Sequence, residues 1–245
     1  MIGTPKGYLL IDAGKTAKRL CAALEEAGIT PAEIGAILLT HEHKDHIHAL
    51  DIYLKQHPIP VHTLEGSVPK LEMSETIKSC LCVHPPRYFE EICGMRVTAF
   101  STPHDSLAST GYRIEIPYGD GKVFRLGYAT DVGYISDEVE KGLTGCDAVI
   151  LESNHDVDML MSGPYPYYLK KRIASRRGHL SNHDSAALAA RLCMKGTKTL
   201  MLAHLSQENN TPEIAYDECV SVVGDACVRI FVAHPHHVTE MNLEG

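Results

Sequence analysis

The segment IGAILLT-HEHKDH, residues 34–46, constrains the fold of this chain more than any other. Its first seven residues are mostly apolar, which is typical of a buried strand, and its last six contain three histidines and two acids. A protein core does not accept so many titratable groups without partners. The strand is therefore expected to end at a sheet edge, where a rigid scaffold presents these side chains on a loop.

Short apolar segments alternate with helical patterns along the chain, which predicts an α/β fold. Strands are expected at 8–12, 34–40, 59–64, 95–103, 111–116, 122–130, 147–153, 199–205 and 226–233. Helices are expected at 16–28, 45–56, 165–177, 182–194 and 212–223. Because no linker, repeat or low-complexity segment interrupts this series, we expect a single domain over residues 1–245.

Composition narrows the class of protein. No apolar run approaches the roughly 20 residues of a membrane span, and the N-terminus lacks a secretory signal pattern, so a cytoplasmic protein is expected. The eight cysteines form no C-x-x-C pair, and most of them are expected to be reduced core residues. The formal net charge of −8 disfavours a protein that coats nucleic acid without preference. Any nucleic-acid partner must meet a local basic patch.

Four of the expected strands end in groups that can bind a metal. The strand at 34–40 leads into the 41–46 cluster, and the strand at 95–103 leads into His104 and Asp105. Asp131 follows the strand at 122–130, and His204 follows the apolar run at 199–203. The spacing of the 41–46 cluster disfavours a solvated polar loop. His104, Asp131 or His204 taken alone would be a capping or surface group, but together with that cluster they favour a binding site.

The residue types fit two metal ions. His41 and His43 can face one ion, Asp45 and His46 a second, and Asp131 is the candidate for a carboxylate shared between them. Nitrogen and oxygen donors suit zinc, manganese or iron, and two ions about 3.5–4 Å apart can hold a hydroxide. The expected ligands are His41, His43, Asp45, His46, His104, Asp131 and His204.

The remaining histidines lack this context. We assign those on expected strands and helices or in other loops to the surface or to packing: His48, His57, His62, His84 and His183. Three more follow the last expected strand, and for them a ligand and a surface role both stay open: His234, His236 and His237.

The pattern H-x-H-x-D-H after a strand, with later His, Asp and His at strand ends, resembles the metallo-β-lactamase fold. This resemblance implies a four-layer αββα sandwich with a dinuclear metal site at one edge of its sheets. Residues 152–182 resemble the YycJ/WalJ group, bacterial metallohydrolases associated with DNA exonuclease activity. Relatives usually begin with a strand and an asparagine-bearing turn near the site, so the single domain is expected to lack the usual first strand.

Ribonuclease Z offers a more distant comparison. Its HEAT motif resembles LESN, which places its glutamate on Glu152, and its GHST motif resembles GHLS, which places its histidine on His179. Its THFS motif resembles AHLS around His204. The resemblance implies that Glu152 and His179 assist proton transfer to the leaving oxygen. Alternatively, Glu152 is a supporting hydrogen-bonding group and His179 a polar residue at a helix start.

The expected function is that of a dinuclear phosphodiesterase, a 5'–3' DNA exonuclease-like enzyme that uses a metal-bridging hydroxide. Asp45, His179 and Glu152 are the expected catalytic residues. Lys170, Arg177, Ser181 and Asn182 are the expected substrate contacts. On a helix over 165–177, Lys170 and Arg177 would share one side, and Arg172 and Arg176 nearly the opposite one.

Other functions compete with this one, because one fold hosts many chemistries. A hydrolase of a small ester, thioester or cyclic nucleotide and an RNA-processing nuclease are the main alternatives. A di-iron redox protein of this fold tends to carry glutamate where this chain has His43. A non-catalytic nucleic-acid scaffold would have lost ligands, whereas all seven positions carry ligand residues here.

Overall fold

The computed structural model describes residues 1–119, 121–224 and 228–241. The chain divides into two compact units: unit 1 comprises 1–101, 106–110 and 114–123, and unit 2 comprises 102–105, 111–113 and 124–245. The start of the predicted strand at 226–233, Cys227 and the last residues of the predicted domain lie outside the described residues. The strands form a five-stranded and a seven-stranded sheet, so the predicted α/β class is confirmed. That 1–245 form a single domain stays a prediction.

Unit 1 contains the five-stranded sheet, whose strands follow one another in the order β1-β2-β3-β4-β5. The strands are β1 (Ile2–Thr4), β2 (Gly7–Ile11), β3 (Ile34–Leu38), β4 (Val61–Leu64) and β5 (Leu81–His84). The β1–β2 pair is antiparallel, and the pairs from β2 to β5 are parallel. Parallel neighbours need crossover segments, and helices in the intervening chain supply them.

The core of unit 1 gathers the apolar residues that the strand and helix patterns predict. Ile37 of β3 is fully buried, and Leu24 of α1 (Ala17–Glu26) packs in the same cluster as Leu50 and Leu54. Burial of such side chains stabilises a fold by roughly 1.5–3 kcal/mol each. This packing holds β3 in place beneath the histidine-rich segment that follows it.

The predicted helix at 45–56 is two helices, α2 (Lys44–Ile47) and α3 (Leu50–Gln56). The backbone of Ala13 interrupts it: the Ala13 N–H donates to the His46 carbonyl, and the Ala49 N–H donates to the Ala13 carbonyl, both at 2.8 Å. A Cβ atom at Gly14 would clash with the Asp45 carbonyl oxygen. The loop after β2 thus packs against the helix backbone, a long-range contact that helical periodicity cannot reveal.

The rest of unit 1 consists of short elements. They are the helices α4 (Val68–Leu71) and α5 (Glu75–Lys78), two 3₁₀ turns at Pro31–Glu33 and Glu65–Ser67, and an antiparallel hairpin of β6 (Phe89–Ile92) and β7 (Met95–Ser101). Strand β8 (Thr110–Tyr118) contributes residues to both units. The predicted strands at 95–103 and 111–116 are confirmed as β7 and β8.

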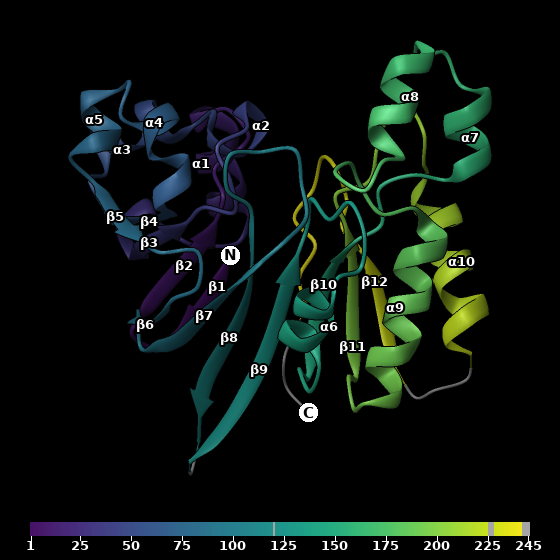
Figure 1. Ribbon diagram of the computed structural model, residues 1–245. Coiled ribbons are helices and arrows are strands. Elements are labelled where there is room, and N and C mark those ends of the chain that lie inside the picture. Colours follow the sequence, from purple (N-terminus) through teal and green to yellow (C-terminus); the bar gives the residue numbers. More distant parts are fainter. Residues whose placement is uncertain (120, 225–227, 242–245) are drawn as a thin grey trace. The chain divides into compact units, whose positions relative to one another are not determined.

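Unit 2 is built on four parallel neighbours of the second sheet, in the order β12-β11-β10-β9. They are β9 (Lys122–Ala129, in this unit from residue 124), β10 (Ala148–Glu152), β11 (Thr199–Ala203) and β12 (Arg229–Val232). The helices are α6 (Asp137–Leu143), α7 (Val157–Ser162), α8 (Tyr167–Ile173), α9 (Asn182–Met194) and α10 (Pro212–Val223). α9 and α10 pack side by side (Figure 1), and the ranges predicted for both are confirmed.

The predicted helix at 165–177 ends early, because α8 stops at Ile173. The chain then turns back: the His179 N–H donates to the Ile173 carbonyl at 2.9 Å, and a Cβ at Gly178 would clash with that carbonyl. Arg176 and Arg177 therefore lie on a turn, and the predicted pairing of basic residues on two helix faces is wrong. Among the described residues, no helix is long and apolar enough to cross a bilayer.

Candidate metal-ligating groups

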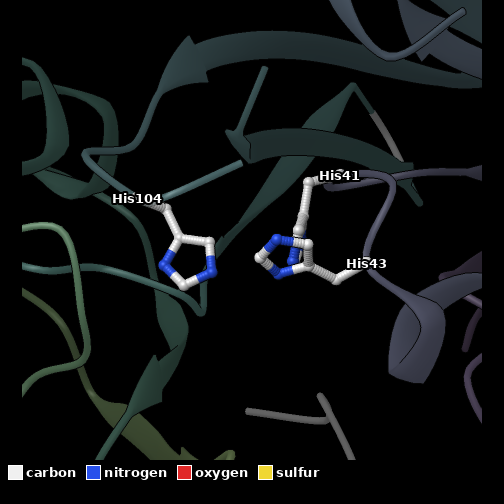
Figure 2. A group of neighbouring side chains, drawn as sticks. All are labelled: His41, His43 and His104. Atoms are coloured by element: carbon white, nitrogen blue, oxygen red, sulfur yellow. The ribbon is translucent and has the colours of Figure 1, made fainter. Parts of the chain in front are cut away.

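In unit 1, three histidines converge directly beyond the end of β3. His41 and His43 lie edge to face with ring centroids 4.5 Å apart, and both rings are drawn in Figure 2. The ring of His46, on α2, lies 4.1 Å from that of His41. His41 and His46 are buried, and the Thr40 hydroxyl lies 3.0 Å from Nδ1 of His41. The structure thus brings together the three unit 1 histidines that the sequence predicts as ligands.

Asp12 fixes the orientation of His46, and sequence reasoning missed it. Its Oδ2 atom lies 2.7 Å from Nδ1 of His46, and the Thr40 hydroxyl donates to the same oxygen at 2.8 Å. The Thr40 N–H donates to Oδ1, also at 2.8 Å. A proton on Nδ1 leaves the lone pair on Nε2, the arrangement that metal-ligating histidines usually show. Asp12 ends the predicted strand at 8–12, so the strand-end criterion could have found it.

The other polar residues of the 41–48 segment differ in how far their side chains are exposed. The Asp45 side chain is 73% exposed, and its Oδ2 lies 3.6 Å from Nε2 of His46. Glu42 is buried and accepts hydrogen bonds from the Ser67 hydroxyl at 2.9 Å and the Leu107 N–H at 2.8 Å. Glu42 therefore braces two loops of unit 1, while Lys44 and His48 are exposed.

In unit 2, the fully buried carboxylate of Glu152, at the end of β10, organises the site. Its Oε1 lies 2.8 Å from Nδ1 of both His179 and His204. Backbone N–H groups of three residues also donate to it, at 2.9–3.2 Å: Asp131, Val132 and Leu180. Five donors compensate the burial of this charge, and they tie three segments of the chain to β10.

Asp131 lies at the centre of the unit 2 histidines. Its Oδ1 is 3.5 Å from Nε2 of His104, 3.8 Å from Nε2 of His204 and 3.7 Å from Nδ1 of His179. His104, also labelled in Figure 2, follows β7, and its Nδ1 lies 3.1 Å from the Gly178 carbonyl oxygen. The structure thus brings together all three unit 2 residues predicted as ligands.

The donor set of unit 2 fits a divalent metal ion. Asp131, Glu152, His179 and His204 each have a donor atom within 4.8 Å of the others. Because Glu152 and Nδ1 of His179 already bond to each other, Asp131 and His204 are the members of this group left to hold an ion. The bonds from Nδ1 to Glu152 and to the Gly178 carbonyl leave the lone pairs of His204 and His104 on Nε2, on the side of Asp131. Imidazole nitrogen and carboxylate oxygen are donors that zinc, manganese and iron accept.

Three of the residues in these groups have an unusual backbone. Asp12, Asp131 and His204 have φ angles of 59°, 57° and 59°, in the left-handed region that non-glycine residues rarely adopt. Asp12 directly follows β2 and His204 directly follows β11, whereas Thr130 separates Asp131 from the end of β9. Such strain costs of order 1–3 kcal/mol and concentrates at functional sites.

The charge on Glu152 shapes the protonation of its neighbours. Burial alone would raise the pKa of Glu152, but the His179 charge and the hydrogen bonds from His179 and His204 outweigh burial and hold it well below its usual value. Burial would lower the pKa of His179, yet the adjacent Glu152 carboxylate raises it. His104 differs, because burial dominates and lowers its pKa. The arrangement therefore favours a positively charged His179 beside an ionised Glu152.

The predicted substrate contacts make hydrogen bonds within unit 2. Lys170 Nζ donates to the Met161 carbonyl at 2.6 Å, and Arg177 Nε donates to the His104 carbonyl at 3.4 Å. Ser181 caps α9 and is buried, and Asn182 exchanges amide hydrogen bonds with Asn210. Their role in binding substrate stays a prediction.

The histidines outside the ligand pattern have other surroundings. His62 and His84 hydrogen-bond to each other at 2.9 Å, and exposed His183 pairs with Glu218. His234 is exposed, and its Nδ1 accepts from the backbone N–H groups of His236 and His237 within one turn.

Comparison with known proteins agrees with this arrangement. Residues 8–205 match the family described as "Beta-lactamase superfamily domain". The chain is 35% identical over 230 residues to exodeoxyribonuclease WalJ of Streptococcus pneumoniae, covering 91% of this chain and 82% of WalJ. The predicted resemblance to the YycJ/WalJ group is thereby confirmed.

Solved structures show the same fold at low sequence identity. The metallo-β-lactamase fold protein YhfI of Bacillus subtilis superposes with a TM-score of 0.69 at 18% identity, covering 94% of this chain and 86% of YhfI. Human tRNase Z, short form, gives a TM-score of 0.65 at 18% identity, covering 99% of this chain and 91% of the other. The predicted metallo-β-lactamase fold is confirmed, and the chain belongs to the β-lactamase superfamily as a metal-dependent hydrolase.

Proposed function

We propose that this protein is a metal-dependent DNA exonuclease. The observation that carries the proposal is the 35% identity, over 91% of the chain, with a protein named exodeoxyribonuclease WalJ. The clustered histidines and carboxylates support it, because they supply the donors that a phosphodiesterase needs to hold divalent metal ions. We further propose that the enzyme degrades DNA in the 5'–3' direction. We also propose a cytoplasmic location, because the described cysteines are free thiols and such thiols stay reduced in that compartment.

Seven residues are the proposed ligands of two ions, zinc or manganese, with iron as a third possibility: His41, His43, Asp45, His46, His104, Asp131 and His204. Two bound ions would lower the pKa of water and polarise the scissile phosphate. Their partners Asp12, Glu152 and the Gly178 carbonyl support the proposal, since each bonds a ligand imidazole through Nδ1. Such supporting groups orient the ligands and raise their basicity.

Asp45 and His179 have proposed roles in the proton transfers. The exposed Asp45 carboxylate can accept a hydrogen bond from the attacking water and align it with the phosphorus. His179, tied through Nδ1 to Glu152, keeps Nε2 for the substrate side and can donate a proton there to the leaving oxygen. Glu152 stabilises the protonated imidazole and thereby prepares it for this transfer.

The direct test is the digestion of end-labelled strands. Metal-loaded protein is incubated with 5'- and 3'-labelled DNA, single-stranded and duplex, and with RNA of the same sequence. The proposal predicts stepwise loss of nucleotides from the 5' end of DNA. Faster hydrolysis of RNA, or of a small cyclic nucleotide or thioester, would instead select one of the alternative functions.

A further inference from the structure

The surface of α8 exposes two adjacent aromatic side chains. Tyr167 is 64% and Tyr168 74% exposed, although side chains of this size normally bury most of their area. The ammonium group of Lys171 lies 4.7 Å from the centre of the Tyr167 ring. A second pair follows the same pattern, with the Arg176 guanidinium 4.0 Å from the centre of the Tyr134 ring.

This region carries positive charge in an acidic protein. Residues 157–177 contain five Lys or Arg and one Asp, which gives a local net charge of +4 in a chain whose total is −8. The cations are Lys170, Lys171, Arg172, Arg176 and Arg177. A polyanion is therefore attracted to this region, whereas two copies of the chain that met through this region would bring like charges together.

The basic and aromatic region is linked to the histidine-bearing loop of unit 2. Arg172 Nε donates to Asp105 Oδ2 at 2.5 Å, and Asp105 is the neighbour of His104 in the chain. Arg177 Nε donates to the His104 carbonyl at 3.4 Å, and Gly178 joins this turn to His179. These contacts hold α8 in a fixed relation to the groups that would act on a phosphodiester.

We propose that Tyr167 and Tyr168 form a stacking platform for the unpaired bases of single-stranded DNA, with Lys171 and the neighbouring cations along the phosphates. The inference rests on the proposed nuclease function and names the form of its substrate. Aromatic rings bind unpaired bases because their faces stack, whereas in a duplex those faces are hidden against neighbouring base pairs. The platform thus selects a single strand for delivery to the site.

Tryptophan fluorescence tests this contact directly, because the sequence contains no tryptophan. In Tyr168→Trp, a stacked base quenches the single indole emission. The matched control is Tyr216→Trp, since Tyr216 is 42% exposed and belongs to α10, outside the basic segment 157–177. Metal-loaded protein is titrated with phosphorothioate oligothymidine, which resists hydrolysis, and with a blunt duplex. We expect strong quenching of Tyr168→Trp by the single strand and little by the duplex or in the control.

Affinity provides the second readout. The double variant Tyr167→Ala, Tyr168→Ala should bind the single strand about tenfold more weakly or worse, as expected when stacked aromatic rings are removed, while Tyr216→Ala should bind normally. Equal affinities for both variants, or equal quenching at positions 168 and 216, would overturn the platform. Altered oligomeric state in the double variant with unchanged DNA binding would also overturn it and would assign the face to self-association.

The outcome separates this inference from the proposed nuclease function. Hydrolysis of bis(p-nitrophenyl) phosphate, a substrate too small to reach the platform, should be equal in the double variant and the unaltered protein. If the protein degrades DNA but the double variant binds single strands normally, the platform fails and the nuclease stands. If single-strand binding depends on the tyrosines while DNA is never degraded, the nuclease fails and the platform stands.

Discussion

Oε1 of Glu152 lies 2.8 Å from Nδ1 of His204. The same oxygen lies equally close to Nδ1 of His179, so one buried carboxylate orients two imidazoles through their Nδ1 atoms. Because the carboxylate also accepts three backbone N–H groups, it cannot move without disturbing the ends of β9 and α9. Glu152 thus couples the geometry of the candidate site to the stability of unit 2.

Glu152→Gln should weaken metal binding and destabilise the protein together. In the unaltered protein the surrounding donors face a carboxylate oxygen, whereas in the variant some of them face the N–H groups of the Gln amide. The neutral amide also no longer stabilises a protonated His179. We expect a 10- to 100-fold loss of zinc affinity, in the usual range for a residue that supports a ligand. Chelator competition and thermal unfolding measure the two effects. Glu140→Gln, which weakens the partly exposed pairs with Arg191 and Lys195, is the control and should change neither by much.

Asp12→Asn should weaken metal binding in unit 1. Asp12 holds Nδ1 of His46, and the amide provides a weaker and differently oriented partner. A drop of roughly 10-fold or more in zinc affinity is expected. Asp51→Asn, in an ion pair with Lys55 on α3, serves as the matched control. Equal zinc affinities for the two variants would show that Asp12 does not support a ligand.

His179→Gln should separate proton transfer from metal binding, whereas Asp45→Ala tests a residue with a proposed role in both. His179→Gln should retain metal but lower kcat by about 10²–10⁴-fold, the usual contribution of a positioned proton donor. Asp45→Ala should abolish turnover while the fold persists, because the Asp45 side chain is mostly exposed. Metal analysis, circular dichroism and kinetics are compared for each variant. A His179→Gln enzyme with unchanged kcat would remove His179 from the proposed mechanism.

The His62–His84 pair should make unit 1 sensitive to acid. Burial and the nearby His84 lower the pKa of His62 to about 4, whereas in the unfolded chain it is about 6.5. The unfolded state therefore binds more protons between these values, and stability falls as the pH drops from 6.5 towards 4. With allowance for partial exposure, we expect this loss to be on the order of 1–2 kcal/mol.

The variant His62→Gln isolates this effect. Whatever its stability at neutral pH, it should lose less stability between pH 6.5 and 4 than the unaltered protein. Urea unfolding in the presence of a chelator measures both pH profiles without a contribution from metal. Parallel profiles would show that the protonation of His62 is not linked to folding.

The sequence predicted the elements that carry long apolar patterns. The strands β2, β3, β10 and β11 and the helices α1, α9 and α10 lie where periodicity places them, since each buries one continuous face. The break between α2 and α3 and the early end of α8 were missed. Both depend on tight backbone contacts at Gly14 and Gly178, which only the folded chain brings together.

The gathering of the candidate ligands was predictable where these residues follow strands. His41, His43 and His46 gather in unit 1, and His104, Asp131 and His204 gather in unit 2, as the strand ends suggested. The sequence did not predict that Glu152 contacts both His179 and His204, or that Asp12 contacts His46. Both are contacts between residues distant in sequence, which no local pattern records.

The central claim is that DNA hydrolysis by this protein depends on the metal ions held by these residues. Its most direct measurement is the rate of nucleotide release from 5'-labelled single-stranded DNA by metal-stripped protein, before and after zinc or manganese is restored. The account predicts negligible release by the stripped protein and recovery with the added ion. Undiminished release by the metal-free protein would contradict it.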